Sequence, residues 1–190
     1  MPCQRQATIH GYRSINGTEA PIRIDSATNT LQTIEYEHHE IHAGSSFTAS
    51  HKAAVAQSAN LDLLIVTPNT SKYAHFTYEF DCEKETELAI YEGVTATAGD
   101  AVVAYNRDRN SATAATVVVT STPTSITAGN TIIRSIHVGS GKTVGGGDRA
   151  THEFILKKNT KYLFRLTNMI SNADNDMSVK LDWYEHTNVI

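Results

Sequence analysis

The stretch Tyr73–Phe80, YAHFTYEF, decides the fold class of this sequence. In an extended chain, its even-numbered residues point to one face and its odd-numbered residues to the other. The even face is apolar or aromatic from Ala74 to Phe80, whereas the odd face carries His75 and Glu79. This period of two predicts a β-strand with one face against a core.

Nine further segments are short, apolar and rich in β-branched and aromatic residues, and several of them alternate, including Lys161–Asn168, KYLFRLTN. Turns rich in Gly, Asn, Asp, Pro and Ser separate them. A short alanine-rich segment, His51–Ala59, is the one weak helical candidate. The ten predicted strands are residues 31–37, 46–52, 61–67, 73–80, 87–93, 115–121, 131–138, 152–158, 161–168 and 177–186.

Many short strands with little helix predict an all-β protein. We expect residues 31–190 to form a single β-sandwich domain, jelly-roll-like in form. Residues 1–30 are polar and lack sustained periodicity, so they are predicted to form an extended N-terminal arm.

Composition excludes several classes of function. The chain has 190 residues, 40% of them hydrophobic, which suffices for one domain with a core. Its net charge is −4 and it has no run of Lys or Arg, which argues against direct binding to nucleic acid. No apolar stretch approaches the ~20 residues needed to cross a bilayer, and the first residues lack the apolar core of a secretory signal.

The two cysteines, Cys3 and Cys82, match neither a zinc motif nor a CxxC redox motif. We expect two free thiols in a protein made in a reducing cytoplasm.

The segment Glu37–His42, EHHEIH, concentrates histidines and carboxylates. As a strand it would place His38, Glu40 and His42 on one face, where they would form a possible set of three metal ligands. The zinc motif HExxH is absent, because His39 stands at its glutamate position. We favour a polar strand face whose histidines contact neighbours or a partner subunit, with metal binding as the second interpretation. No cofactor is expected.

The segment Gly139–Thr143, GSGKT, resembles the end of a phosphate-binding loop. The full motif requires a glycine where Ile136 stands, and a helix after the lysine. The following VGGGDR contains three glycines and cannot sustain that helix. This segment is predicted to be a flexible hairpin or loop tip.

The segment Asn106–Asn110, NRDRN, places two arginines around Asp108 in a predicted turn. Arg107 and Arg109 could bind a carboxylate of a partner in a bidentate manner. The loop could equally hold itself together through Asx turns and an Arg–Asp pair. Loops on a rigid scaffold often carry recognition, so a contact with a partner is a reasonable hypothesis.

The segment Leu181–His186, LDWYEH, ends the last predicted strand. Trp183 is predicted to lie in the core, and Tyr184 and His186 to lie at a subunit interface, where tyrosine is enriched.

No GxSxG motif and no recognisable pair of acids is present, so we expect no catalytic residue and no enzyme activity. The interface candidates are His38, His39, His42, Arg107, Asp108, Arg109, Tyr184 and His186.

Four phrases in order along the chain resemble a family of tailed-bacteriophage virion structural proteins. They are TIEYEHHEIHAGSSF (Thr33–Phe47), AYNRDRNS (Ala104–Ser111), GGGDRATHEFILKKNTKYLFRLTN (Gly145–Asn168) and LDWYEH (Leu181–His186). Members of this family are generally taken as capsid decoration or head-stabilising (cement) proteins. The likeness covers most of the chain but not residues 1–30, and it supplies no catalytic residue.

The resemblance implies a non-enzymatic protein that cements the capsid by binding between subunits of the major capsid protein. It implies a place on the outer surface of the virion, after synthesis in the cytoplasm of the host bacterium. A homo-oligomer is expected, with a trimer favoured.

Two other functions stay open. A tail or head-fibre module could bind host-surface glycan, with Tyr73, Tyr105 and Trp183 stacking on sugars. A metal-dependent hydrolase of the cupin or jelly-roll type would use His38, Glu40 and His42.

Overall fold

The computed structural model describes residues 10–12, 19–21, 36–148 and 153–187, and the side chains of residues 37–138 and 153–187. The chain divides into two compact units, Met1–His39 and Glu40–Ile190. In the first unit, β1 (His10–Tyr12) and β2 (Glu19–Pro21) form an antiparallel pair. The predicted boundary after residue 30 lies outside the described residues.

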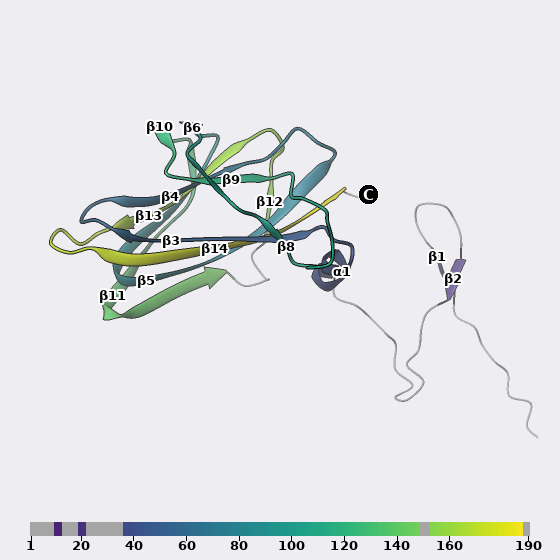
Figure 1. Ribbon diagram of the computed structural model, residues 1–190, viewed down its shortest axis with the longest axis horizontal. Helices are drawn as coiled ribbons and strands as arrows, with labels where there is room; N and C mark the ends of the chain where they lie inside the picture. The colour runs from purple at the N-terminus through teal and green to yellow at the C-terminus, as the bar shows by residue number, and fades with distance from the viewer. Residues whose placement is uncertain (1–9, 13–18, 22–35, 149–152, 188–190) are drawn as a thin grey trace, which may run out of the picture. The chain divides into compact units, whose positions relative to one another are not determined.

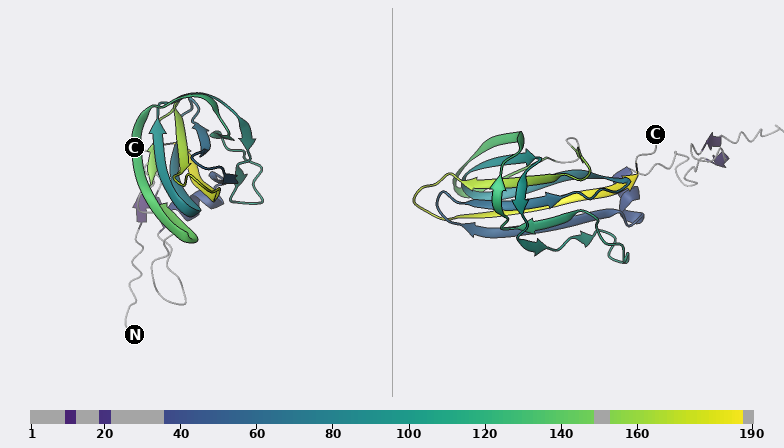
Figure 2. Two further views of the ribbon diagram at one scale, coloured as in Figure 1. Left: turned by 90° about the vertical axis from the view of Figure 1, so that its left-hand side faces the viewer. Right: turned by 90° about the horizontal axis from the view of Figure 1, so that it is seen from above.

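The second unit is built almost wholly of antiparallel strands, which confirms the predicted all-β sandwich (Figure 1). Viewed along the strands, the sheet curls so that two layers face each other (Figure 2). The strand order does not establish the predicted jelly-roll form. The strands are β3 (Ser46–Val55), β4 (Asn60–Val66), β5 (Lys72–Glu92), β6 (Thr95–Thr97), β7 (Asp100–Val102), β8 (Tyr105–Asn106), β9 (Val118–Ser121), β10 (Thr124–Thr127), β11 (Asn130–Asp148), β12 (Phe154–Leu156), β13 (Lys161–Asn168) and β14 (Asn175–Thr187).

Strand β5 runs through both layers. Residues 72–82 of β5 pair with β14, and residues 86–92 pair with β13. Its other edge pairs with β11 along both halves and with β12 near its start. The first layer therefore has the order β8-β3-β14-β5, and the second has the order β5-β13-β4-β9-β7. The two strands predicted at 73–80 and 87–93 are one continuous strand.

The core lies between these layers and follows the predicted alternation. Even-numbered residues of β5 are buried from Ala74 to Ile90, except at the bend near Lys84. The ring of Tyr78 meets that of Phe164 edge-on, with 5.2 Å between the centroids. Burying an aromatic or aliphatic side chain of this kind contributes about 1.5–3 kcal/mol.

Trp183 lies in this core, as predicted, together with Phe47; the two side chains are 2% and 1% exposed. Their ring centroids are 5.9 Å apart. The short pair β6–β10 covers part of the outer side of the second layer, where Leu64 and Leu163 pack with Val94. Burial on both sides explains the continuous apolar run at residues 63–66 of β4 and the apolar Leu163 on the second face of β13.

Two predictions of local structure are wrong. The helix predicted at His51–Ala59 is absent: β3 continues to Val55 because it pairs with β14 over its whole length. A helix of that length is marginal alone, so the ladder determines the conformation. The loop tip predicted at Gly139–Thr143 lies instead within β11, where the register shifts on both sides of Ser140. Such shifts are β-bulges, which accommodate glycine.

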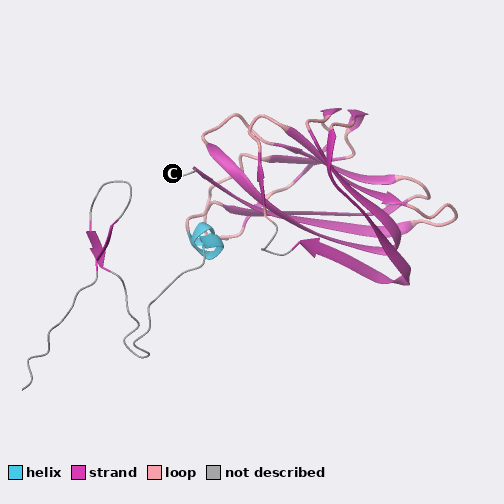
Figure 3. Cartoon of the chain, turned by 180° about the vertical axis from the view of Figure 1, so that it is seen from behind, coloured by secondary structure: helices cyan, strands magenta, loops and turns pink. Residues whose placement is uncertain are grey.

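Helix α1 (Tyr36–His42) is the only helix among the described residues, as Figure 3 shows. None of the described helices is long and apolar enough to cross a membrane.

The bend in β5 is held by one buried side chain. Within the described ladders, residues 83–85 of β5 pair with neither β13 nor β14. The side-chain oxygen of Asn175 accepts hydrogen bonds from the amides of Glu83 and Lys84, both at 3.0 Å. Its side-chain nitrogen donates to the Lys84 carbonyl at 3.2 Å and to the Thr86 hydroxyl at 2.9 Å. Asn175 is fully buried and so replaces the missing ladder bonds.

We predict that Asn175→Ala lowers the free energy of unfolding by about 2–3 kcal/mol, because it removes the hydrogen bonds of a fully buried side chain to partly buried backbone groups at the bend. Urea denaturation of the variant measures this loss. The control Asn130→Ala, at an exposed position at the start of β11, should change the value by less than about 0.5 kcal/mol. Equal effects of the two substitutions would contradict the role given to Asn175.

A second buried polar group lies where β13 meets the turn after β12. The hydroxyl of Tyr162 donates to the Glu92 carboxylate at 3.0 Å and accepts from the Lys157 amide at 2.9 Å. Burial, reinforced by the neighbouring Glu92 carboxylate, raises the pKa of Tyr162 to about 12. The phenol therefore keeps its proton in the folded protein at a pH where an unfolded chain would lose it.

A raised pKa of an acid makes the folded state less stable as pH rises, because only the unfolded state then releases its proton. We predict that the stability linked to Tyr162 is intact below about pH 10 and declines between about pH 10 and 12. Urea midpoints across this range should fall less steeply for Tyr162→Phe than for the natural chain. Tyr105→Phe, at an exposed tyrosine, should leave the slope unchanged.

Candidate interaction surface

The histidine-rich segment forms helix α1, so the predicted strand at residues 31–37 and its extension through His42 are wrong for the described residues. A helix turns about 100° per residue, so Glu40 does not share a face with His38 and His42. The predicted set of three ligands on a strand face is therefore not formed. Among the described residues, no group of three or more His, Cys, Asp or Glu side chains is placed to hold a metal ion.

The helix ends at a glycine in the left-handed region. Gly44 has φ 69°, and its amide donates to the Ile41 carbonyl at 3.0 Å, while the Ser45 amide donates to the Glu40 carbonyl at 3.0 Å. These two bonds form a Schellman C-cap. Gly44 therefore separates helix α1 from β3.

The glutamate and histidine side chains of the segment Glu37–His42 differ in their exposure. Glu40 is 5% exposed, and its carboxylate accepts a hydrogen bond from the Ser45 hydroxyl. His38, His39 and His42 are exposed. Their proposed contact with a partner stays a prediction.

The segment Tyr105–Ser111, here called the arginine loop, is ordered by Asx turns. The amide of Asp108 donates to the side-chain oxygen of Asn106 at 2.9 Å, and the amide of Asn110 donates to the carboxylate of Asp108 at 3.0 Å. This confirms the Asx turns that the sequence suggested. The loop therefore has a set conformation before any partner binds.

Asn106 attaches the arginine loop to the rest of the second unit. It is 8% exposed, and its side-chain nitrogen donates to the carbonyls of Gly44 at 2.8 Å and Thr113 at 3.0 Å. The amide of Arg107 donates to the Ser46 carbonyl at 2.8 Å, where β3 begins. The loop is thus fixed to the turn that ends α1 and to the first residue of β3.

The outer side of the arginine loop combines cationic and aromatic groups. Tyr105 is 53% exposed, and the Arg109 guanidinium lies 5.1 Å from the centre of its ring. An open hollow of about 490 Å³ is lined by Thr48, Tyr105, Asn106, Arg107 and Arg109. Arginine and tyrosine are enriched among residues that dominate binding energy, so this hollow suits a protein partner.

An ion pair on β14 lies next to the positive charge of the loop. Lys180 forms an ion pair with Asp182 at 2.7 Å, and this carboxylate raises the pKa of Lys180, although Arg107 works in the opposite direction. Arg107 and Lys180 are therefore close enough to share one electrostatic environment.

The last strand places its predicted interface residues in a cluster with two residues that the sequence did not single out. Tyr184 is 8% exposed; its ring stacks on His75 with 4.5 Å between centroids, and its hydroxyl donates to Glu153 at 2.9 Å. His186 is partly exposed and contacts His75. The alternation of Tyr73–Phe80 placed His75 on the outer face, but no local signal linked it to Glu153.

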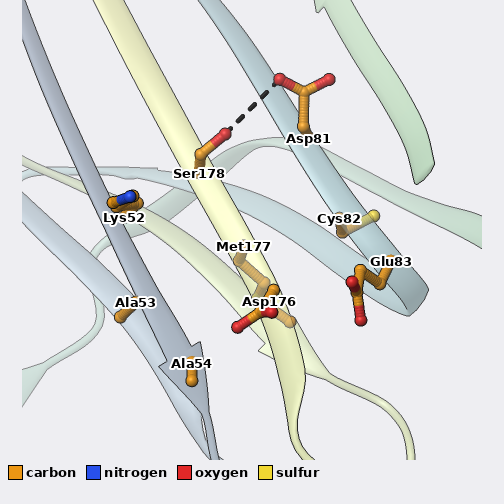
Figure 4. Close-up of a pocket in the computed structure, with 9 residues that line it drawn as sticks. All are labelled: Lys52, Ala53, Ala54, Asp81, Cys82, Glu83, Asp176, Met177 and Ser178. Carbon is orange, nitrogen blue, oxygen red and sulfur yellow. Dashed lines mark hydrogen bonds between the residues drawn. The ribbon is translucent and has the colours of Figure 1, made fainter.

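A second hollow, of about 510 Å³, lies over β3, β5 and β14 (Figure 4). Acidic groups from Asp81, Glu83 and Asp176 surround it, and the Ser178 hydroxyl donates to Asp81 at 3.4 Å. Cys82, which also lines it, is 1% exposed, and burial raises the pKa of its thiol. A raised pKa lowers the thiolate fraction, so Cys82 has the character of a core residue and not of a nucleophile.

Comparison with known proteins assigns none of these surfaces to a family. No protein-family model matches the chain, and no curated protein matches its sequence significantly.

We predict that Asn106→Ala loosens the arginine loop, because it removes the bonds to Gly44, Thr113 and Asp108. Hydrogen exchange at the amide of Asp108 should become faster, while exchange in β13 stays slow. The control Asn110→Ala removes an exposed side chain and its 3.4 Å hydrogen bond to the Asp108 carboxylate, but keeps the bond between Asn106 and the Asp108 amide. If the Asp108 amide exchanges hydrogen at the same rate in both variants, Asn106 does not hold the arginine loop in place.

Proposed function

We propose that this protein is a non-enzymatic virion structural protein that decorates and cements the capsid of a tailed bacteriophage. It would bind between subunits of the major capsid protein on the outer surface of the shell, as a homo-oligomer and preferably a trimer. The four-phrase resemblance supports the family. The observation that carries a binding role is the pre-ordered arginine loop with its exposed aromatic and cationic side chains.

The loop suits attachment to a large assembly for a physical reason. Ordering a flexible loop on binding costs conformational entropy, and a loop already fixed by Asn106 and Asp108 avoids much of that cost. Arg107 and Arg109 suit carboxylates on a partner surface. A protein that binds only the assembled shell stabilises that shell by mass action, and an oligomer adds avidity.

Buried polar groups of the sandwich support a structural role. The Glu185 carboxylate, 2% exposed, accepts hydrogen bonds from the amides of Thr116 at 2.9 Å and Val117 at 3.0 Å, and from the indole of Trp183 at 3.0 Å. These bonds hold the segment before β9 against the end of β14. The carboxylate stabilises the fold that carries the arginine loop.

We predict that Arg107→Ala combined with Arg109→Ala weakens binding to capsids by at least about tenfold, since loss of a dominant interface residue costs more than about 1 kcal/mol. Co-sedimentation with expanded capsids that lack the protein measures this loss. The control Lys52→Ala with Arg134→Ala removes the same charge from exposed positions on β3 and β11 and should retain binding. Density for the protein on the tail alone, in a reconstruction of the virion, would refute the proposal.

The second candidate is a tail or head-fibre module that binds host-surface glycan. Exposed Tyr105 beside Arg109 favours it, since an aromatic face can stack on a sugar ring. Trp183 does not contribute, because it is buried in the core. Absence of binding on a glycan array, together with unchanged adsorption of a phage carrying Tyr105→Ala, would count against this function.

A further inference from the structure

We propose that His75 and His186 form a binding site for a divalent late transition-metal ion of the Zn²⁺, Cu²⁺ and Ni²⁺ class. This inference is independent of the proposed capsid role. His75 lies on β5 and His186 on the neighbouring strand β14, and the Nε2 atoms of the two rings are 2.6 Å apart. Imidazole is a preferred ligand of these ions, and here two of them converge.

The hydrogen bonds of the pair fix where its protons are. Nδ1 of His75 faces the carboxylate of Glu153, which also accepts from the Tyr184 hydroxyl, so this nitrogen is the donor. Nδ1 of His186 faces the Thr187 carbonyl at 3.0 Å and must donate as well. Both Nε2 atoms are therefore directed at each other, and one proton between them makes the observed contact.

A metal ion can take the place of that proton. Metal–nitrogen bonds of about 2.0–2.1 Å would hold two nitrogen ligands about 2.9–3.4 Å apart, depending on the coordination angle. The observed 2.6 Å needs to widen by less than an ångström. His186 is partly exposed near the end of β14, so its ring has room to shift and water can complete the coordination.

The surroundings have the form usual for metal-bound histidines. Such histidines donate their other ring N–H to a carboxylate or a backbone carbonyl, which fixes the tautomer and makes the ligand more basic. His75 has Glu153 in this role, and His186 has the Thr187 carbonyl. The stacked ring of Tyr184 restricts the orientation of His75.

A bound metal ion would have both negatively and positively charged groups near it. Glu153 and the Tyr184 hydroxyl are the titratable groups bonded in the cluster, and the Glu153 carboxylate offsets the charge of a cation. On β5, Tyr73 pairs with His186, and the Lys158 ammonium, 4.1 Å from the centre of the Tyr73 ring, opposes a second positive charge. With two imidazole ligands from the protein, we expect micromolar and not structural-zinc affinity.

Isothermal titration of the full chain with Zn²⁺ tests the site. We expect one Zn²⁺ per chain and the release of one proton, seen as a dependence of the heat on the ionisation enthalpy of the buffer. His186→Gln should remove this binding. Glu153→Gln should weaken it by about 10–100-fold, as is usual for a residue that orients a metal ligand.

The matched control uses the other pair of histidines. His38 and His42 are four residues apart in α1, a spacing that can also bind zinc. The double variant His38→Gln with His42→Gln should leave the one-ion binding unchanged. Binding lost in this variant but kept in His186→Gln would overturn the proposal, as would no stoichiometric binding to the natural chain. Should His186→Gln fail to fold by circular dichroism, unchanged affinity in Glu153→Gln would also overturn it.

Discussion

The hydrogen bonds of Asn175 across the bend of β5 are the interaction on which the rest of the sandwich depends. A strand that leaves one layer for another must break its ladder, and the amides and carbonyls at the break are costly to bury unpaired. Asn175 supplies a donor and an acceptor from the first residue of β14, so one carboxamide both satisfies the bend and sets the start of the next strand. With the bend fixed, β13 and β14 pair in succession along one edge of β5, and the apolar faces of the two layers meet.

Buried polar side chains secure other irregular points in the same way. Asn168 donates to the carbonyls of Val55 at 3.1 Å and Ala173 at 3.0 Å, which ties the turn after β3 to the loop before β14. Glu185 holds the segment that precedes β9. These groups lie where regular pairing stops, because only there do backbone donors and acceptors need side-chain partners. The apolar core provides the free energy of folding, while these polar contacts determine where each strand begins or turns.

The sequence patterns correctly predicted the structural features that depend on local periodicity. The alternation in Tyr73–Phe80 gave the orientation of β5, and Trp183 was placed correctly in the core. The helix at Tyr36–His42 was missed because the polar and apolar residues of this short segment suit either period, and the Schellman cap at Gly44 is visible only in three dimensions. The continuity of β5 was missed because its hydrophilic middle resembles a turn when the partner that satisfies it, Asn175, is distant in sequence.

The candidate sites also differ in whether they depend on neighbouring or on distant residues of the sequence. The arginine loop could be found from its sequence, because Asx turns form between neighbours and need no distant partner. The contact of His75 with His186 joins residues 111 positions apart, and it exists only because β5 and β14 pair in one particular register. A shift of that register by one residue would place the two rings on opposite faces of the sheet. The bend at Asn175 and the outer cluster at the other end of β14 are therefore coupled: the residue that sets where β14 begins also determines which side chains meet where it ends.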